Sequence, residues 1–277
     1  MTAPADPPLV ITLTSDFGSA DPYVAAMKGV ILGINPRAVL VDVTHEVQPQ
    51  RLLHAVFLTQ AAWPFFPPGA IHVAVVDPEV GTARRALVLQ TPQGLFVGPD
   101  NGVLSSALLD DARPGDAPRS MALPAGFRAF AITEPRYLRE PVSATFHGRD
   151  VFAPAAAHLS LGVPPDAFGE PVHEIVAFPP LRARPDAAGA LRAQVLHIDR
   201  FGNIVTDARA ADLPAGAIAV EIAGRTVPGL ARVYAEARGL MALVGSAGYL
   251  EVALPDGNAA ALLGVEIGAP ALVRAAS

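Results

Sequence analysis

The sequence predicts an α/β protein of two domains: an N-terminal Rossmann-like domain with a largely parallel sheet, and a small C-terminal all-β barrel. Three observations carry this prediction. Apolar strands alternate with helical segments over residues 1–180. A stretch rich in proline, alanine and arginine follows at residues 181–192. Short apolar runs separated by glycine-containing turns then fill residues 193–277.

The N-terminal domain begins with a strand, a helix and a strand. Residues 9–13 form a compact apolar run, residues 23–33 read as a helix closed by glycine, and residues 39–43 are a second apolar run. The same reasoning predicts a further helix at residues 52–62 and a third strand at residues 70–76. A further strand pair or hairpin is expected at residues 86–89 and 95–97.

Three acids stand at or beside the ends of these strands: Asp16, Asp42 and Asp77. In a parallel sheet the ligand lies beyond the carboxyl ends of the strands. A single carboxylate at a strand end is commonly a helix cap, but three at one edge predict a polar pocket there.

The C-terminal half reads differently. Residues 181–192 have no clear period, as expected of a linker, and the domain boundary is placed there. The strands expected beyond it are short: residues 193–198, 217–222, 241–244, 249–254 and 271–273. Such a pattern predicts a small barrel over residues 193–277.

Composition bounds the partners. The chain has 277 residues, 51% of them hydrophobic, with 20 basic and 26 acidic side chains. Lys28 is the only lysine, so no basic stripe is available for nucleic acid. The absence of cysteine removes disulfides and thiolate metal sites. Without a signal-like start or a long apolar run, we expect a cytoplasmic protein with no membrane segment.

Common fingerprints are missing, namely GxGxxG, a Walker-type phosphate loop, HExxH and GxSxG. Dense polar clusters stand out instead: TSDFG at 14–18, DVTH at 42–45, DPEVGTAR at 77–84, PDNG at 99–102, TFHGRD at 145–150 and DRFGN at 199–203. In this order the clusters resemble the S-adenosyl-L-methionine hydroxide adenosyltransferase family, relatives of fluorinating and chlorinating enzymes. The resemblance covers residues 9–274.

The resemblance implies hydrolysis of S-adenosyl-L-methionine, in which water displaces methionine from ribose C5′ and adenosine is released. It implies no cofactor and no metal. It also implies a homotrimer in which the small domain of one subunit closes the pocket on the large domain of its neighbour. The small-molecule substrate is then the expected partner.

The family's water-holding Asp, Arg and His match Asp77, Arg84 and His147. Displacing a neutral thioether needs no general acid, but the attacking water must lose a proton. Asp77 would accept that proton or orient the water, with Arg84 keeping it ionised, while His147 would complete the water's hydrogen bonds or relay the proton. These roles stay open, and a structural ion pair beside a buried histidine is the alternative.

The resemblance also assigns substrate-binding positions. Asp16 matches the carboxylate that binds the ribose hydroxyls, Asp199 and Asn203 match the methionine end and the adenine or ribose side, and Ser246 matches the methionine carboxylate site. The remaining positions are Phe146, Tyr249, Asn258 and Ala259, the last two resembling a backbone segment that reads the adenine edge. Plain β-turns compete with these readings around residues 245–249 and 257–260.

The halogenating relatives differ at several positions. They carry arginine at Ala247, and the fluorinating branch has serine at Gly148, lacks the Asp77 carboxylate and has an extra loop that is not found at residues 87–99. Halogenation is therefore disfavoured.

Two further classes of function remain open. A metal-dependent hydrolase would draw ligands from Asp42, His45, His72, Asp77 and His147, although no pair has a known spacing and Arg84 would repel a cation. The second class is a sensor that binds S-adenosylmethionine or a nucleoside without turnover.

Overall fold

The computed structural model of the chain describes residues 10–236 and 238–276. The chain divides into two compact units between Pro180 and Leu181. Within the described ranges, no helix is both long and apolar enough to cross a membrane.

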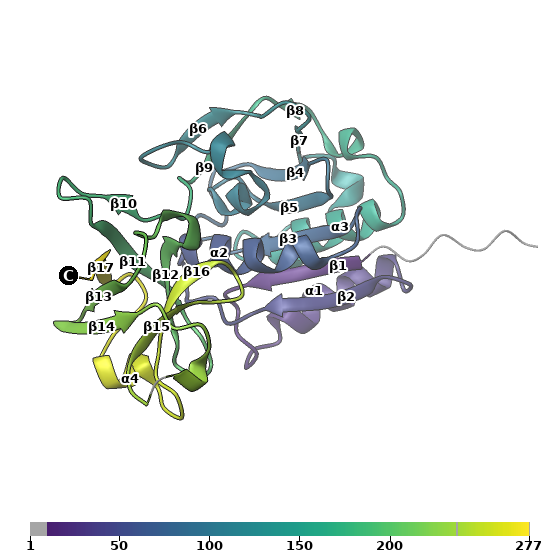
Figure 1. The fold of residues 1–277 in the computed structure, drawn as a ribbon. Coiled ribbons are helices and arrows are strands. Elements are labelled where there is room, and N and C mark those ends of the chain that lie inside the picture. The colour runs from purple at the N-terminus through teal and green to yellow at the C-terminus, as the bar shows by residue number, and fades with distance from the viewer. Residues whose placement is uncertain (1–9, 237, 277) are drawn as a thin grey trace, which may run out of the picture. The chain divides into compact units, whose positions relative to one another are not determined.

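The first unit contains a seven-stranded mixed sheet in the order β2-β1-β3-β5-β4-β7-β8 (Figure 1). Its parallel half consists of β1 (Val10–Ser15), β2 (Val39–Thr44), β3 (Ile71–Val75) and β5 (Leu95–Pro99). The antiparallel half adds β4 (Ala86–Gln90), β7 (Arg128–Ala131) and β8 (Pro171–Val172). The predicted α/β class is confirmed. The first strand was expected at residues 9–13; Leu9 lies outside the described residues, and β1 continues to Ser15.

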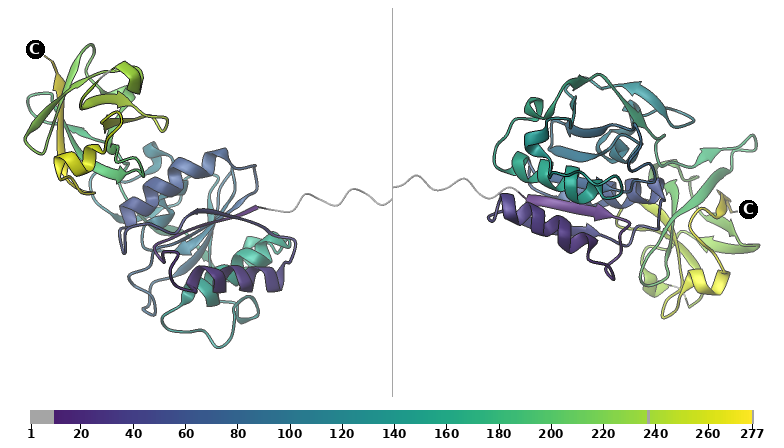
Figure 2. Two further views of the ribbon diagram at one scale, coloured as in Figure 1. Left: turned by 90° about the horizontal axis from the view of Figure 1, so that it is seen from below. Right: turned by 180° about the vertical axis from the view of Figure 1, so that it is seen from behind.

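Helices cover both faces of this sheet. α1 (Tyr23–Ile34) and α3 (Ala153–Ser160) lie on one face, and α2 (Leu52–Ala62) lies on the other (Figure 2). Side chains of β3 alternate between the two cores, with Val73 facing α1 and α3 and Ala74 facing α2. Every residue of β3 is buried, and all of them except His72 are apolar, which explains why the sequence predicted a strand here.

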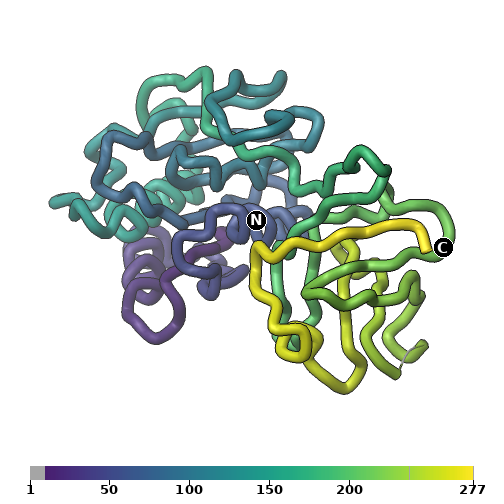
Figure 3. The backbone as a smooth tube through the Cα atoms, turned by 90° about the vertical axis from the view of Figure 1, so that its left-hand side faces the viewer, coloured from purple at the N-terminus to yellow at the C-terminus, as the bar shows by residue number. Residues whose placement is uncertain are grey.

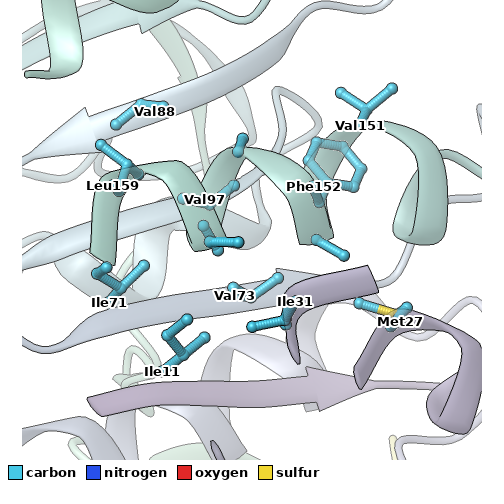
Figure 4. Packing of buried hydrophobic residues seen from close by; sticks show 14 of the residues in the cluster. Ile11, Met27, Ile31, Ile71, Val73, Val88, Val97, Val151, Phe152 and Leu159 are labelled. Atoms are coloured by element: carbon cyan, nitrogen blue, oxygen red, sulfur yellow. The ribbon is translucent and has the colours of Figure 1, made fainter. Parts of the chain in front are cut away.

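The core under α1 and α3 supports the site. Ile11, Met27, Ile31 and Phe152 are at most 1% exposed and interlock between the sheet and these helices (Figure 4). Burial of each such side chain stabilises the fold by roughly 1.5–3 kcal/mol. α3 was not predicted because its sequence, APAAAHLS, is nearly all small residues and has no amphipathic period.

Short elements complete the first unit. A two-stranded sheet pairs β6 (Arg119–Ala122) with β9 (Glu174–Ala177). The helical turns are η1 (Trp63–Phe65), η2 (Val103–Ala107), η3 (Asp110–Ala112), η4 (Pro135–Tyr137), η5 (Gly148–Phe152) and η6 (Pro165–Phe168). η5 is a wide π-type turn that leads directly into α3.

The second unit is an antiparallel, nearly closed barrel, as predicted. Its strands follow the order β14-β13-β17-β11-β12-β16-β15, and a bridge between Ala231 and Leu243 brings the two edges together. In Figure 3 the backbone of this unit is coloured from green to yellow. The strands are β11 (Leu191–Ile198), β12 (Ile204–Arg209), β13 (Ile218–Ile222), β14 (Arg225–Gly229), β15 (Met241–Val244), β16 (Tyr249–Ala253) and β17 (Pro270–Ala275). The helical elements are η7 (Ala210–Asp212), η8 (Tyr234–Glu236) and α4 (Ala259–Leu263).

The segment expected as a linker, residues 181–192, is folded into the second unit. β10 (Arg184–Pro185) pairs with the start of β11, and Leu181 and Ala183 are buried. Asp186 accepts hydrogen bonds from the backbone N–H groups of Ala188 and Ala190, which closes the turn between the two strands. Its proline- and alanine-rich composition therefore encodes a short hairpin rather than a free connection.

Candidate active site

Two of the strand-end carboxylates lie at one edge of the first sheet. Ser15 of β1 is paired with Val75 of β3 in parallel register, so Asp16 and Asp77 follow the carboxyl ends of neighbouring strands. Asp16 Oδ2 accepts the backbone N–H of Gln50 at 2.9 Å. Gln50 has a positive φ of 64°, a conformation uncommon for a residue with a side chain. This contact fixes one oxygen of Asp16.

Asp77 and Arg84 form a buried, two-pronged ion pair. The Arg84 Nε donates to Asp77 Oδ1 at 2.9 Å, and Nη2 donates to Oδ2. Both side chains are only 5% exposed, and the Arg84 guanidinium lies over the Phe152 ring. Removing one partner of such a pair leaves a buried charge uncompensated, at a cost of about 3–5 kcal/mol. The pair is therefore rigidly held at the strand edge.

His147 joins this pair through Arg84. The Arg84 Nη2 lies 2.7 Å from His147 Nδ1, and because a guanidinium only donates, Nδ1 must be the acceptor. The proton of the neutral ring is then on Nε2. Burial, followed by the charge of Arg84, lowers the pKa of His147, while Asp77 and Asp150 oppose the shift. His147 is thus a neutral hydrogen-bond donor at Nε2.

An aromatic cluster connects the Asp16 segment with the His147 segment. Phe17, Tyr23 and Phe146 have ring centroids 5.1–5.8 Å apart. A Cβ at Gly148 would lie 3.1 Å from both Met27 Sδ and Phe17 Cε2. The absence of a side chain at Gly148 thus allows Phe17 to pack against the turn that carries His147.

Asp150 holds that turn in place. It is fully buried and accepts hydrogen bonds from Arg149 and from the backbone N–H of Ser143. Burial opposes ionisation, but these hydrogen bonds and the charges of Arg149 and Arg139 lower its pKa. The TFHGRD cluster signalled this region, although Asp150 itself was not singled out from the sequence.

The five side chains considered as metal ligands are distributed among different environments. His72 packs among Trp63, Phe66 and Phe96, and burial lowers its pKa to about 4. Asp42 pairs with His45 and Lys28. Arg84 contacts both Asp77 and His147. Among the described residues, no group of three or more His, Asp or Glu side chains is arranged to hold a metal ion.

In the second unit, Asp199 organises the loop between β11 and β12. Its Oδ1 accepts the backbone N–H groups of Phe201 and Asn203 at 2.9 and 2.8 Å, and Oδ2 accepts the Asn203 side-chain amide at 2.9 Å. A cavity of about 800 Å³ is lined by Asp199, Phe201, Asn203 and Tyr234. Phe201 is 76% exposed, so an apolar ring and a carboxylate face the same space.

Asn258 and Ala259 lie beside this loop. Asn258 caps α4 by accepting the Ala261 N–H at 2.7 Å, and Ala260 donates its N–H to the Gly202 carbonyl. Gly202 has φ 85°, and a Cβ there would overlap the Asn258 side chain. The side chain of Ala259 is fully buried, so only its backbone can face a ligand.

Ser246 and Tyr249 lie in other surroundings. Ser246 is exposed in the turn between β15 and β16. Tyr249 is 7% exposed, lies under the Arg209 guanidinium and receives a hydrogen bond from it. The structure therefore brings Asp199, Asn203 and Asn258 together and places Tyr249 against Arg209.

Sequence reasoning missed Tyr234 and Glu251. The Tyr234 hydroxyl donates to Glu251 Oε2 at 3.3 Å, and burial raises the pKa of Glu251, with the charge of Asp199 adding to the shift. Tyr234 is a lone aromatic residue in a polar loop, so no local sequence pattern predicted a role for it.

Comparisons with known proteins place this geometry in context. Models described as the N- and C-terminal domains of SAM hydroxide adenosyltransferase match residues 11–169 and 193–271. A protein of Thermus thermophilus named (R)-S-adenosyl-L-methionine hydrolase is 43% identical, covering 92% of this chain and 96% of its own length. One of the same name from Salinispora arenicola is 41% identical, covering 93% and 95%. An Actinoplanes fluorinase is 26% identical, covering 76% and 75%.

Solved structures show the same fold. The crystal structure of an uncharacterized conserved protein from Thermotoga maritima superposes with a TM-score of 0.82 at 29% identity, covering 96% of this chain and 99% of that one. A conserved hypothetical protein from Thermus thermophilus gives 0.72 at 40% identity, with the same coverage.

Proposed function

The chain belongs to the SAM hydroxide adenosyltransferase family, and on that premise we propose that it hydrolyses S-adenosyl-L-methionine to adenosine and L-methionine. Relatives at 34–43% identity over most of the chain are named (R)-S-adenosyl-L-methionine hydrolase. Their names specify the R sulfonium, and we propose the same epimer here. The single observation that carries the proposal is the Asp77–Arg84–His147 arrangement.

The proposed reaction is one displacement. An oxygen lone pair of water forms the bond to ribose C5′ as the C5′–sulfur bond breaks, and the bonding electrons neutralise the sulfonium, so methionine leaves uncharged. The water oxygen becomes the 5′-hydroxyl of adenosine after losing one proton. Holding water in line with the bond converts an encounter into a positioned attack. A proton acceptor beside the water lowers the barrier further.

Asp77 is the group we assign as that acceptor. Arg84 occupies one lone pair of each Asp77 oxygen, and each carboxylate oxygen can accept a second hydrogen bond. His147 takes a different part, because its Nδ1 is engaged by Arg84. Its Nε2–H would donate to the water oxygen and orient it while Asp77 receives the proton. The geometry therefore favours orientation by His147 over a proton relay through it.

Recognition of the substrate is assigned to both units. We propose that Asp16 uses the oxygen left free by Gln50 to bind the ribose hydroxyls. Asp199 and Asn203 would bind the methionine end and the adenine or ribose side, with Ser246 at the methionine carboxylate. Phe146, Tyr249, Asn258 and Ala259 complete the proposed set; because Tyr249 packs on Arg209, we assign it a supporting part.

Gly148 bears on the choice of nucleophile. A serine at this position would bring its Cβ to 3.1 Å from Phe17 and Met27, closer than ordinary van der Waals contact. A hydroxyl donor for a halide therefore requires Phe17 to move. This supports water rather than halide as the nucleophile.

We further propose that the enzyme needs no metal or cofactor and works as a homotrimer with its sites at subunit interfaces. Because a sulfonium is already a good leaving group, the chemistry asks only for a positioned water and a proton acceptor. Turnover is expected to be insensitive to chelators. Activity is expected to follow the trimer fraction as the protein is diluted, measured by mass photometry alongside initial rates.

The proposal is tested by incubating chelator-treated protein with each sulfonium epimer and quantifying adenosine and methionine by chromatography. We expect equimolar products from the R epimer. The matched variant Asp100→Asn, which disrupts another arginine-paired buried carboxylate, should keep turnover. Binding without products would support the sensor, and product formation only after a divalent metal is restored would support the metal-dependent hydrolase.

A further inference from the structure

A second polar network lies beneath the Asp16 segment and takes no part in the proposed chemistry. Ser15 Oγ lies 2.7 Å from His45 Nδ1, and His45 Nε2 lies 3.0 Å from Asp42 Oδ1 as an ion-pair contact. The ammonium of Lys28 is 2.5 Å from the other oxygen of Asp42. The network thus runs from the buried end of β1 to the partly exposed Lys28 on α1.

The contacts favour one polarity for the network. With the ring proton of His45 on Nε2, 3.0 Å from the Asp42 carboxylate, Nδ1 accepts the hydroxyl proton of Ser15. The Ser15 oxygen in turn lies 3.4 Å from the backbone N–H of Phe17. Although serine, histidine and aspartate are in series, Ser15 is 1% exposed, so substrate cannot reach it as a nucleophile.

His45 holds the Asp16 segment from both of its ends. Its ring holds Ser15, and its carbonyl accepts the N–H of Gly18 at 2.8 Å. The loop after His45 adds a third tie, because the N–H of Val47 donates to the Ser15 carbonyl at 3.3 Å. Asp16 is therefore enclosed between two residues that His45 fixes, and its Oδ2 is fixed separately by Gln50.

We propose that His45 is a positioning residue that aims Asp16 at the ribose diol and so sets the enzyme's preference for an intact ribose. The inference rests on the proposed function, because it needs an adenosyl group bound at Asp16. A carboxylate that accepts from two vicinal hydroxyls discriminates strongly only when its orientation is fixed, since a mobile side chain adapts to a single hydroxyl.

The test is calorimetric binding of adenosine, 2′-deoxyadenosine and 3′-deoxyadenosine to the full-length protein, which needs no turnover. Wild type should prefer adenosine by about tenfold or more, the usual scale for hydrogen bonds to a charged group. In His45→Ala this preference should fall to within about twofold. His45→Asn, whose amide oxygen replaces Nδ1 as an acceptor, should restore part of it.

Two further variants separate positioning from stability. Ser15→Ala removes the hydroxyl with minimal change in volume and should lower the preference as His45→Ala does, even if His45→Ala folds poorly. His158→Ala alters a partly buried histidine that packs on Tyr137 of the same unit and should keep the wild-type preference.

Three outcomes are distinguishable. Loss of ribose preference in His45→Ala and Ser15→Ala supports the inference. An unchanged ratio, even with all three ligands weakened equally, overturns it and leaves the proposed function intact. Failure of wild type to prefer adenosine over the two deoxyadenosines overturns the inference, whereas the proposed function is overturned only if no adenosine and methionine are released from the R epimer.

Discussion

The two units of the molecule treat buried carboxylates in opposite ways. In the first unit, Asp77, Asp100 and Asp150 are each paired with arginine. In the second unit, Asp207 and Glu251 are buried with backbone and hydroxyl partners instead. Burial accordingly raises the pKa of Asp207 to about 6 and raises that of Glu251.

This difference matches the chemistry that we propose for Asp77. A carboxylate that must take a proton from water has to be ionised in a dry setting, and an arginine partner keeps it so. A unit that mainly shapes a cavity can use carboxylates to fix loops, as Asp199 fixes residues 199–203. We therefore assign the proposed proton chemistry to the first unit, and we propose that the second contributes shape and polarity.

Breaking the charged pair at Asp77 should have the largest effect. Asp77→Asn removes the proton acceptor and leaves Arg84 without its carboxylate, so kcat should fall about 10³-fold, while KM changes by less than about threefold. Steady-state kinetics on the R epimer measures this.

Asp100→Asn is the matched control. Asp100 is also buried, but its partner Arg85 is 43% exposed, so Asp100→Asn should lower the melting temperature less than Asp77→Asn does and leave kcat within about twofold. If Asp77→Asn behaved like Asp100→Asn, the assignment of the acceptor would be wrong.

The contrast in pKa predicts opposite pH dependences of stability. The pKa of Asp207 rises from 3.8 to about 6 on folding, so the native state binds more protons between these values. The free energy of unfolding should therefore fall as pH rises through this window, by up to about 3 kcal/mol. Asp150, whose pKa is lowered, contributes stability that is lost as pH falls.

Urea unfolding of wild type and Asp207→Asn from pH 4 to pH 7.5 checks the sign. Asparagine keeps the acceptor for the Gln194 N–H and carries no charge, so the variant should match wild type near pH 4 and exceed it at pH 7.5. Parallel curves across the range would contradict the account.

His147 sharpens the distinction between orienting and relaying. His147→Gln places an amide donor near the position of Nε2 and should keep kcat within about fivefold, whereas His147→Ala should lower it about 30-fold. If His147 relayed the proton instead, kcat should fall equally in His147→Gln and His147→Ala. The pH profile adds a check. The ordinary pKa of a histidine is 6.5, and the pKa of His147 lies below it. Wild-type kcat should therefore not fall as the pH is lowered from 7 to 6.5.

The smallest expected effect is at Asp199. Asp199→Asn retains an oxygen for the backbone N–H groups of the loop but loses the negative charge, so KM should rise about tenfold with kcat nearly unchanged. The difference should vanish for a substrate analogue that lacks the α-amino group. An equal rise in KM for both substrates would place the methionine amine elsewhere.

The sequence predicted those parts of the fold that rest on local apolar pattern. β3 and α2 were recognisable because apolar residues dominate both segments. β12 and β14 were missed, since IVTDAR and RTVPG mix polar residues and proline into strands that only their barrel neighbours stabilise.

The site was predictable to a similar extent. Asp77 and Arg84 flank one turn, so their pairing is nearly local. His147 is 63 residues from Arg84, and only the resemblance joined them. The tie between Ser15 and His45 spans 30 residues, and Tyr234 meets Glu251 across a loop; such contacts depend on strand order, which residue patterns do not encode.

The most direct test of the account is hydrolysis of the R epimer in 18O-water, followed by mass spectrometry of the adenosine and methionine. Displacement by water held at Asp77 predicts one 18O atom, located at the 5′ oxygen of adenosine, and unlabelled methionine. Adenosine without label, or label in methionine alone, would contradict attack of water at C5′.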